Sequence, residues 1–287
     1  MSLGLNKTKR RIASVKSTQK ITKAMGMVAS VKLKRCKDRF EKSLQYRDQI
    51  GVLLAKSFHY ATKPDQTFTS SPEGAECVLY ILVTSDLGLC AGYNSSLLKL
   101  AHEKIRPELD DLLLLGEKGK MHFLRDERFA PRILELPHMK LGASYRRCHL
   151  FARHLMELFA SKKYARVELI YTHYVNSLRF EPSVATLLPI QPSAELPPHE
   201  EYAPPIYEPQ ASDMLQSLLP YYLAGSFYNY LAESELSEQS SRRMAMDNAN
   251  DNADELLEKL TIEYNKARQS AITQEIVEVV SGASNAT

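Results

Sequence analysis

The chain has 287 residues, 44% of them hydrophobic and 25% charged, with a formal net charge of +3. This composition is that of an ordinary globular protein, and it excludes a wholly disordered, collagen-like or low-complexity chain. No run approaches 18 consecutive apolar residues and the basic N-terminus lacks an apolar core, so neither a transmembrane helix nor a secretory signal is expected.

The first 63 residues differ from the rest in charge and in proline content. They hold 16 Lys or Arg and 3 Asp or Glu, a net charge of +13, whereas the remainder holds 21 and 31, a net charge of −10. They contain no proline, because the first one is Pro64. A proline-free basic segment predicts one long helix, and its partner could be nucleic acid or an acidic protein, or the charges could simply face solvent. The same segment carries a loose apolar stripe, formed by Ile12, Val15, Ile21, Met25, Val28 and Val31.

The middle of the chain alternates strand and helix signals. Continuous apolar runs such as 77–84 predict strands that are buried on both faces, and apolar residues at helical spacing separate them. This order predicts an α/β sheet whose last strand is antiparallel. The expected strands are 77–84, 112–115, 133–136, 167–174 and 184–188, and the expected helices are 95–106 and one capped by Ser144. A proline-rich extended loop is expected at 189–210.

Two loops in this region are candidates for a ligand-binding or catalytic site. Residues 115–120 (LGEKGK) lack the spacing and the hydroxyl residue of a phosphate loop, so a strand-to-helix turn is the better interpretation. Residues 85–94 follow the first strand, at the usual ligand position of an open α/β sheet, but Cys90 has no base beside it in the sequence. A structural turn is therefore expected there, with Asn94 as a cap of the next helix.

No catalytic, metal or cofactor site is expected from the remaining side chains. The eight histidines are scattered without a zinc-protease or serine-protease pattern. The cysteines form no CxxC pair and are expected to be free thiols in a reducing compartment. They are Cys36, Cys77, Cys90 and Cys148.

The C-terminal segment predicts a second long helix with a coiled-coil seam. It is free of proline after Pro220. Its seam residues step by three and four with one stutter, and they are Met246, Ala249, Ala253, Leu256, Leu260, Tyr264, Ala267 and Ala271. Two helices this long most simply pair with each other. The expected fold is therefore α/β, with a long antiparallel coiled coil of the N- and C-terminal helices and an inserted Rossmann-like domain. The expected division is 1–63, 75–195 and 210–287.

Four segments resemble the signatures of the F-type ATP synthase gamma subunit. Residues 11–29 (RIASVKSTQKITKAMGMVA) resemble its N-terminal signature, and residues 264–282 (YNKARQSAITQEIVEVVSG) its C-terminal one. Residues 237–246 resemble the segment upstream of the latter, and residues 85–94 resemble its SDRGLCGGxN turn. Leu87 and Ala91 depart from the Arg and Gly of that turn, and Gly26 stands where relatives usually carry a charge.

The resemblance implies a central rotor shaft with no catalytic residue of its own. Such a subunit couples ion flow through a membrane ring to ATP synthesis or hydrolysis on the alpha and beta subunits. Its partners would be the alpha–beta hexamer, the epsilon subunit and the c-ring, with no nucleic acid. It would lie at the cytoplasmic face of the bacterial plasma membrane, as a peripheral protein held by the complex.

The resemblance also implies contact residues. Met25, Arg242, Arg268, Gln269 and Thr273 match positions that face the stator, and Tyr207 and Glu208 match positions near the ring. An apolar face at the end of the chain would turn in a hydrophobic sleeve, and it comprises Ile272, Ile276, Val279 and Val280. If Met25 lies level with Arg242, Met1 lies level with about residue 266, and the tip projects alone for roughly 30 Å.

Two other classes of function stay open from the residues alone. One is a coiled-coil protein that binds nucleic acid, although the basic helix has no aromatic residue before Phe40 to stack on bases. The other is a small α/β enzyme with a helical arm. A salt-dependent gel shift would support the first, and saturable turnover by the isolated chain would support the second.

Overall fold

The computed structural model describes residues 2–61, 66–135, 139–191, 208 and 210–284. Both long helices form as predicted, α1 over Ser2–Tyr60 and α5 over Ala211–Ser284, with Pro220 inside α5. By contact the chain divides into two compact units. The coil unit comprises residues 1–30 and 242–287, and the sheet unit comprises residues 31–241. None of the helices in the described part of the chain is long and apolar enough to cross a bilayer.

The sheet unit contains a five-stranded sheet in the order β3-β2-β1-β4-β5. Strands β1 to β4 are parallel to their neighbours, and β5 runs antiparallel to β4, as predicted. The strands are β1 (Cys77–Val83), β2 (Asp111–Leu115), β3 (Ile133–Leu134), β4 (Tyr164–Asn176) and β5 (Arg179–Leu188). The shorter helices are α2 (Tyr93–Lys104), α3 (Glu117–Phe123) and α4 (Tyr145–Ala160), with a 3₁₀ turn at Ala130–Arg132.

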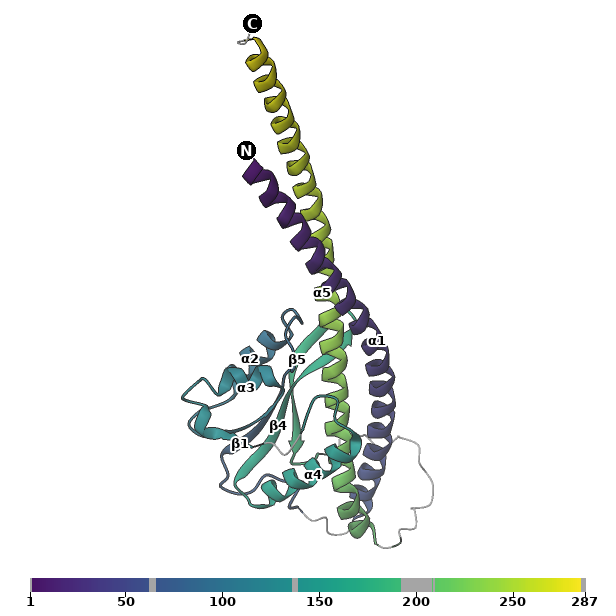
Figure 1. Cartoon of the computed structure of the whole chain (residues 1–287). Coiled ribbons are helices and arrows are strands. Elements are labelled where there is room, and N and C mark those ends of the chain that lie inside the picture. Colours follow the sequence, from purple (N-terminus) through teal and green to yellow (C-terminus); the bar gives the residue numbers. More distant parts are fainter. Residues whose placement is uncertain (1, 62–65, 136–138, 192–207, 209, 285–287) are drawn as a thin grey trace. The chain divides into compact units, whose positions relative to one another are not determined.

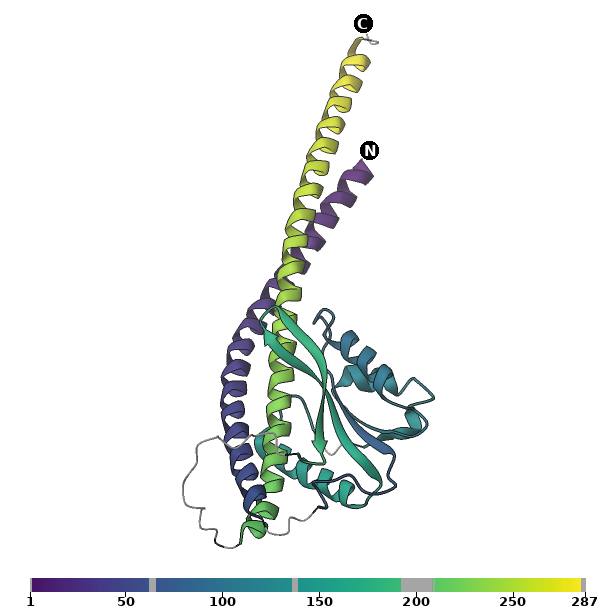
Figure 2. The ribbon, with the colours of Figure 1, turned by 180° about the vertical axis from the view of Figure 1, so that it is seen from behind.

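Different helices cover the two faces of the sheet (Figures 1 and 2), and the apolar residues of the strands alternate between these faces. Leu79, Ile81 and Val83 of β1 pack in one core with α4 and with α5 residues 215–231. Val78, Tyr80 and Leu82 pack in a second core with α2 and α3. All seven residues of β1 are buried, which is why its sequence is apolar without alternation.

Two predicted helix caps are corrected by the structure. The helix α4 begins after Ser144, as expected, but the Ser144 side chain makes no cap hydrogen bond. Asn94 does not cap α2, whose N-cap is Gly92. Its side chain instead accepts a hydrogen bond from the Ser85 backbone N–H (3.1 Å) and donates one to the Ser85 hydroxyl (2.7 Å). Asn94 thus ties the 85–94 loop to the first turn of the helix.

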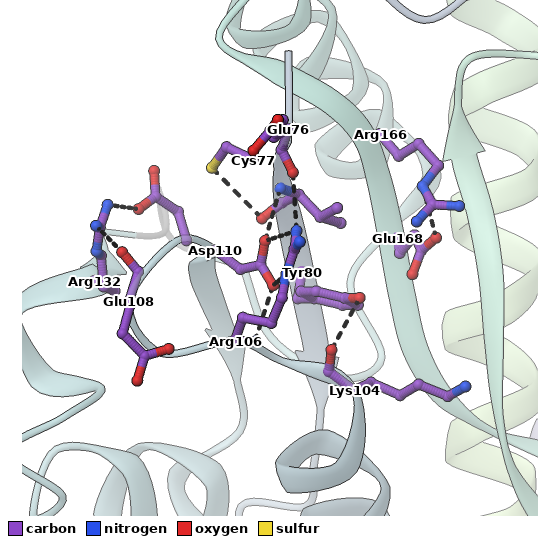
Figure 3. A network of polar contacts seen from close by, with 12 residues as sticks. Glu76, Cys77, Tyr80, Lys104, Arg106, Glu108, Asp110, Arg132, Arg166 and Glu168 are labelled. Atoms are coloured by element: carbon purple, nitrogen blue, oxygen red, sulfur yellow. Dashed lines mark hydrogen bonds and ion pairs between the residues drawn. The ribbon is translucent and has the colours of Figure 1, made fainter. Parts of the chain in front are cut away.

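A charged network holds the amino ends of β1 and β2 together (Figure 3). The fully buried Asp110 carboxylate accepts hydrogen bonds from the Val78 N–H (3.0 Å) and from Arg106, whose Nη2 lies 2.8 Å from Oδ1. The Arg106 guanidinium also donates to the Glu76 carbonyl at 2.8 Å. A buried carboxylate needs such donors, because an unpaired charge in the core costs several kcal/mol.

Asp111, the next residue, has donors from three other positions. Lys163 pairs with its carboxylate, the Tyr164 hydroxyl donates at 2.8 Å, and Arg132 Nη1 lies 3.4 Å away. Burial alone would raise the pKa of Asp111, but the hydrogen bonds from Lys163 and Tyr164 outweigh it, so the pKa lies below its usual value. The network is structural: it ties β2 to β4 and to the turn before β3.

In the coil unit the seam of α1 differs from the predicted stripe. Ile12 and Val15 are half-buried as expected, and Met25 is half-buried too. Ile21, Val28 and Val31, however, are 60%, 56% and 59% exposed. The positions that face α5 recur in strict steps of three and four: Leu5, Thr8, Ile12, Val15, Gln19, Thr22, Gly26 and Ala29. Several of these are polar or small, so hydrophobicity alone does not mark them.

The seam of α5 follows the prediction closely. Met246 and Leu260 are buried, and the other predicted seam residues are half-buried except Ala267, which is exposed. A seam built from alanine, glycine and threonine lets two helix backbones approach each other closely. Near Gly26 and Ala29 the two antiparallel helices therefore pack closely, with larger apolar side chains only at intervals, and toward the start of α1 they spread apart (Figure 1).

Candidate contact surfaces

The register of the coil unit follows from three contacts. The Thr22 hydroxyl donates to the Asn250 side-chain oxygen at 2.5 Å, and the Gln19 amide donates to an Asp254 carboxylate oxygen at 2.6 Å. A Cβ built on Gly26 would lie 3.4 Å from the Met246 Cβ. Each contact pairs positions whose numbers add to 272 or 273.

This register corrects the assumption that Met25 lies level with Arg242. Met25 lies opposite position 247, more than one helical turn from Arg242. The mismatch arises because both residues were placed by resemblance to contacts with another subunit, which need not lie at one level of the shaft. Met25 is half-buried on α1, and Arg242 is buried, at 7% exposure.

The end of α5 carries an apolar face that nothing in the described chain covers. Residues 272–284 lie past the last position that α1 can pair with, so the helix continues alone for about 20 Å, less than the predicted 30 Å. Ile272 is 44% exposed, Ile276 57% and Val279 72%. Val280 and Val277 are also exposed, and Val277 was not among the predicted residues. A contiguous exposed apolar face is the usual mark of an interaction surface.

At the base of this tip the two helices leave an open depression of about 490 Å³. Leu5 and Asn6 of α1 line it from one side, and Tyr264, Arg268 and Ile272 of α5 line it from the other. The predicted contact residues Gln269 and Thr273 are exposed. The Thr273 hydroxyl donates to the Gln269 carbonyl at 3.0 Å, so its proton is used within the helix while the Gln269 amide faces outward.

The predicted ring-side pair is only partly described. Glu208 is exposed, in a bend before α5. Tyr207 lies outside the described residues.

The two helices of the coil unit carry opposite charges. Residues 1–30 hold seven exposed Lys or Arg and no acidic residue: Lys7, Lys9, Arg10, Arg11, Lys16, Lys20 and Lys23. The facing stretch of α5 is rich in carboxylates: Asp247, Asp251, Asp254, Glu255, Glu258 and Glu263. From the sequence alone, the basic helix could face nucleic acid, an acidic protein or solvent. The chain's own second helix supplies part of the negative charge along it.

Within the sheet unit, a buried polar band joins α5 residues 233–241 to β4 and to the 85–94 loop. Sequence reasoning missed this band. The Glu233 carboxylate, 4% exposed, accepts from the Tyr174 N–H at 3.0 Å and pairs with His173 Nδ1 at 2.6 Å. Ser234 accepts from the Thr172 N–H at 3.2 Å, and the Ser241 hydroxyl donates to the Cys90 carbonyl at 2.7 Å. Burial raises the pKa of Glu233, although its partners oppose the shift. Serines and glutamates in a long helix normally indicate a solvated face, so no pattern pointed to this band.

Both candidate ligand loops are filled by the chain's own contacts. At 115–120 the backbone N–H groups that a phosphate would need donate to protein acceptors: Glu117 to Asp86, Lys118 to the Ser85 carbonyl and Gly119 to the Thr84 hydroxyl. Gly116 has φ +92, and a Cβ there would collide with the Thr84 carbonyl at 2.0 Å. This is the strand-to-helix turn that the sequence predicts.

The 85–94 loop is a strained turn packed on its own side chains. Leu89 and Ala91 have positive φ, 61° and 44°, which is costly for residues with a Cβ. The buried Cys90 thiol lies 3.2 Å from the Asn94 amide nitrogen. All four cysteines of the chain are buried and free.

Comparison with known proteins agrees with this geometry. The family model described as ATP synthase matches residues 4–285. The ATP synthase gamma chain of Mycoplasma mobile is 37% identical over 97% of this chain and 97% of its own length. The ATP synthase gamma chain of Symbiobacterium thermophilum is 36% identical over 96% of this chain and 95% of its own.

Solved structures share the fold. A chain of the Euglena gracilis mitochondrial ATP synthase, in an OSCP/F1/c-ring structure, superposes with a TM-score of 0.70 at 20% identity over 99% of this chain and 95% of that one. A chain of the Tetrahymena thermophila mitochondrial ATP synthase central stalk and c-ring has a TM-score of 0.56 at 26% identity, over 80% and 99% of the two chains. The family model and the near-full-length relatives show that this chain belongs to the ATP synthase gamma chain family.

Proposed function

We propose that this chain is the central rotor shaft of an F-type ATP synthase and has no catalytic site of its own. It couples ion flow through the membrane ring to ATP synthesis or hydrolysis on the alpha and beta subunits by rotating inside their hexamer. The observation that carries the proposal is the lone apolar end of α5, together with membership of the gamma chain family.

The tip explains how one helix can turn inside a ring of subunits. Ile272, Ile276, Val279 and Val280 would be an aggregation hazard on a free protein, and they suit a smooth hydrophobic sleeve made by the hexamer. Just below, Arg268, Gln269 and Thr273 are proposed contacts with stator loops, and Met25 and Arg242, much further along the coil, are two more. The exposed Arg268 and Gln269 can reach such loops directly.

The sheet unit supports a role as the foot of the shaft. The buried polar band of Glu233, Ser234 and Ser241 ties α5 to the sheet by several hydrogen bonds, so torque on one would be carried by the other. We assign the foot to residues 75–195, between shaft segments 1–63 and 210–287. Its partners would be the epsilon subunit and the c-ring, and Tyr207 and Glu208 would lie on the ring side.

The location follows from these partners. The complex would hold the chain at the cytoplasmic face of the bacterial plasma membrane, as a peripheral protein. The relatives named above come from bacteria, which supports a bacterial setting.

A single-molecule rotation assay tests the proposal. The chain would be assembled with alpha and beta subunits on a surface, and a bead attached through Lys99→Cys, a position whose side chain is 81% exposed in the sheet unit. The native cysteines are buried, and burial raises the pKa of Cys36 and of Cys148 to about 12, so labelling should favour the new thiol. Rotation in one direction with ATP, and none without ATP, is the expected result.

The isolated chain supplies the control. We expect no ATP hydrolysis and no tight ATP binding by calorimetry, because the 115–120 loop uses its N–H groups internally. Turnover by the chain alone, or assembly without rotation, would contradict the proposed role. A gel shift with nucleic acid at physiological salt would favour the alternative class.

A further inference from the structure

Two histidines meet on the surface of the sheet unit. His102 lies on α2 and His122 on α3, and their Nε2 atoms are 2.8 Å apart. The ring centroids are 5.1 Å apart and the ring planes cross at 75°, so the rings meet end to end rather than stacking. Two imidazole nitrogens from different helices thus lie within hydrogen-bond distance of each other.

Aromatic neighbours hold both rings in place. The His102 ring lies 5.0 Å from Phe123 and 5.3 Å from Phe129, and the His122 ring lies 5.1 Å from Phe123. Both phenylalanines are buried, at 0% and 2% exposure. The packed phenylalanines keep the two imidazoles beside each other, which lowers the entropy lost when a ligand fixes them, while rotation about the soft χ2 torsion of each ring is still needed.

The pair opens into a shallow depression of about 680 Å³ in which charges are balanced. His102, Met121 and His122 line it. Its four charged residues sum to no net charge: Arg128 donates to Asp126 at 3.0 and 2.8 Å, and Arg125 and Glu127 add one charge of each sign. A cation can therefore approach without meeting a net positive surface.

We propose that His102 and His122 form a surface site for a borderline divalent metal ion, of the Ni²⁺ or Cu²⁺ class, that links α2 to α3. Imidazole nitrogen is a preferred ligand of these ions. Bonds of about 2.0–2.1 Å that meet at a right angle place two nitrogens about 2.9 Å apart, close to the separation in the structure. A tetrahedral ion would need them about 3.3 Å apart, so Zn²⁺ fits less well.

The site differs from a closed structural metal centre. No group of three or more His, Cys, Asp or Glu side chains among the described residues is arranged to hold a metal, so water would complete the coordination. For both Nε2 atoms to offer a lone pair, the proton that now lies between them would move through solvent to the Nδ1 of the ring that carries it. Each ring must turn about its χ2 torsion to aim its lone pair at the ion, and this torsion is soft.

Calorimetric titration of the full chain with NiCl₂, without a polyhistidine tag, tests the site. We expect one saturable site, and about tenfold or greater weakening in each of the single variants His102→Gln and His122→Gln. His154→Gln on α4 is the matched control, because the His154 side chain is 40% exposed and pairs with the Glu157 carboxylate at 4.0 Å rather than with a second imidazole. Circular dichroism of each variant checks that the fold is intact.

A spectroscopic measurement separates a two-histidine site from scattered binding. With one equivalent of Cu²⁺, electron paramagnetic resonance should show two imidazole nitrogens on the copper, and one or none in either single variant. Failure to saturate, equal weakening by His154→Gln, or an unchanged spectrum in the variants would each show that the pair is only a hydrogen bond between helices and would overturn the proposal.

Discussion

Thr22 of α1 donates a 2.5 Å hydrogen bond to the side-chain oxygen of Asn250 on α5. One turn further along, Gln19 donates to Asp254 in the same way. Polar side chains inside a coiled-coil seam cost stability but select one register, because any slip leaves them without partners. These two contacts therefore define which residues of the coil unit face each other.

The register can be tested by a disulfide. A Cβ at position 26 would lie 3.4 Å from the Met246 Cβ, close to the 3.5–4.5 Å that disulfides require. The double variant Gly26→Cys with Met246→Cys should therefore cross-link readily under mild oxidation. Mobility on a non-reducing gel, and its reversal by reductant, would measure the bond.

The matched control is Met25→Cys with Arg242→Cys. In the observed register these positions are more than one turn apart along the coil, so no cross-link should form. A cross-link in this pair and none in the first would mean that the helices pair about five residues out of the register described here.

The seam shows where prediction from sequence succeeds and where it fails. On α5 alanine, leucine and methionine recur in steps of three and four, and the structure confirms most of the predicted positions. On α1 the predicted stripe drifted to Ile21 and Val28, which are exposed. The true seam passes through Gln19, Thr22 and Gly26. Hydrophobic periodicity cannot find a seam whose members are selected for hydrogen bonds and close approach.

The departure of Ala91 from the family pattern leads to a stability prediction. Its φ of 44° is a conformation that glycine adopts freely and alanine does not. Ala91→Gly should raise the free energy of unfolding by about 0.5–1 kcal/mol, as relief of strain outweighs the added freedom of the unfolded chain. Urea unfolding would measure it.

Ala24→Gly, at an exposed position within α1, serves as the control and should lower stability by about 1 kcal/mol. If both substitutions destabilise equally, the turn at 85–94 is not strained.

The Asp111 network leads to a pH prediction. The pKa of Asp111 is depressed, so its ionised form stabilises the fold above its ordinary pKa of about 3.9, and this contribution is lost as pH falls through the lower folded value. Asp111→Asn should cost about 1–3 kcal/mol at pH 7, because Lys163 loses its charged partner. The difference between variant and parent should shrink below about pH 4.

Unfolding curves from pH 7 to pH 3 would test this, with Glu181→Gln as a control whose ion pair with Arg179 is exposed and should matter little. A constant difference across that range would rule out the charge as the cause.

How the sheet is built was predictable from sequence, whereas its attachment to α5 was not. The run CVLYILV predicts a doubly buried strand, and the structure places it at the centre of the sheet. Glu233 and Ser234, by contrast, are buried only because β4 presents backbone groups that need partners. Such complementarity depends on segments some 60 residues apart, and one sequence carries no local signal of it.

Two substitutions distinguish the role of the apolar tip from that of the polar positions near its base. Ile276 is 57% exposed, so Ile276→Asp should leave the thermal stability of the isolated chain unchanged. In a hydrophobic sleeve the same carboxylate would lose its water, which costs several kcal/mol, so recovery of the assembled complex should fall sharply. Gln269→Ala removes only an outward amide on a helix, so assembly should be normal, while turnover of the assembled enzyme should slow because a hydrogen bond to the stator is lost. Subunit recovery and turnover would be measured for both variants side by side. Normal assembly and full rotation with Ile276→Asp would rule out the sleeve, whatever the behaviour of Gln269→Ala.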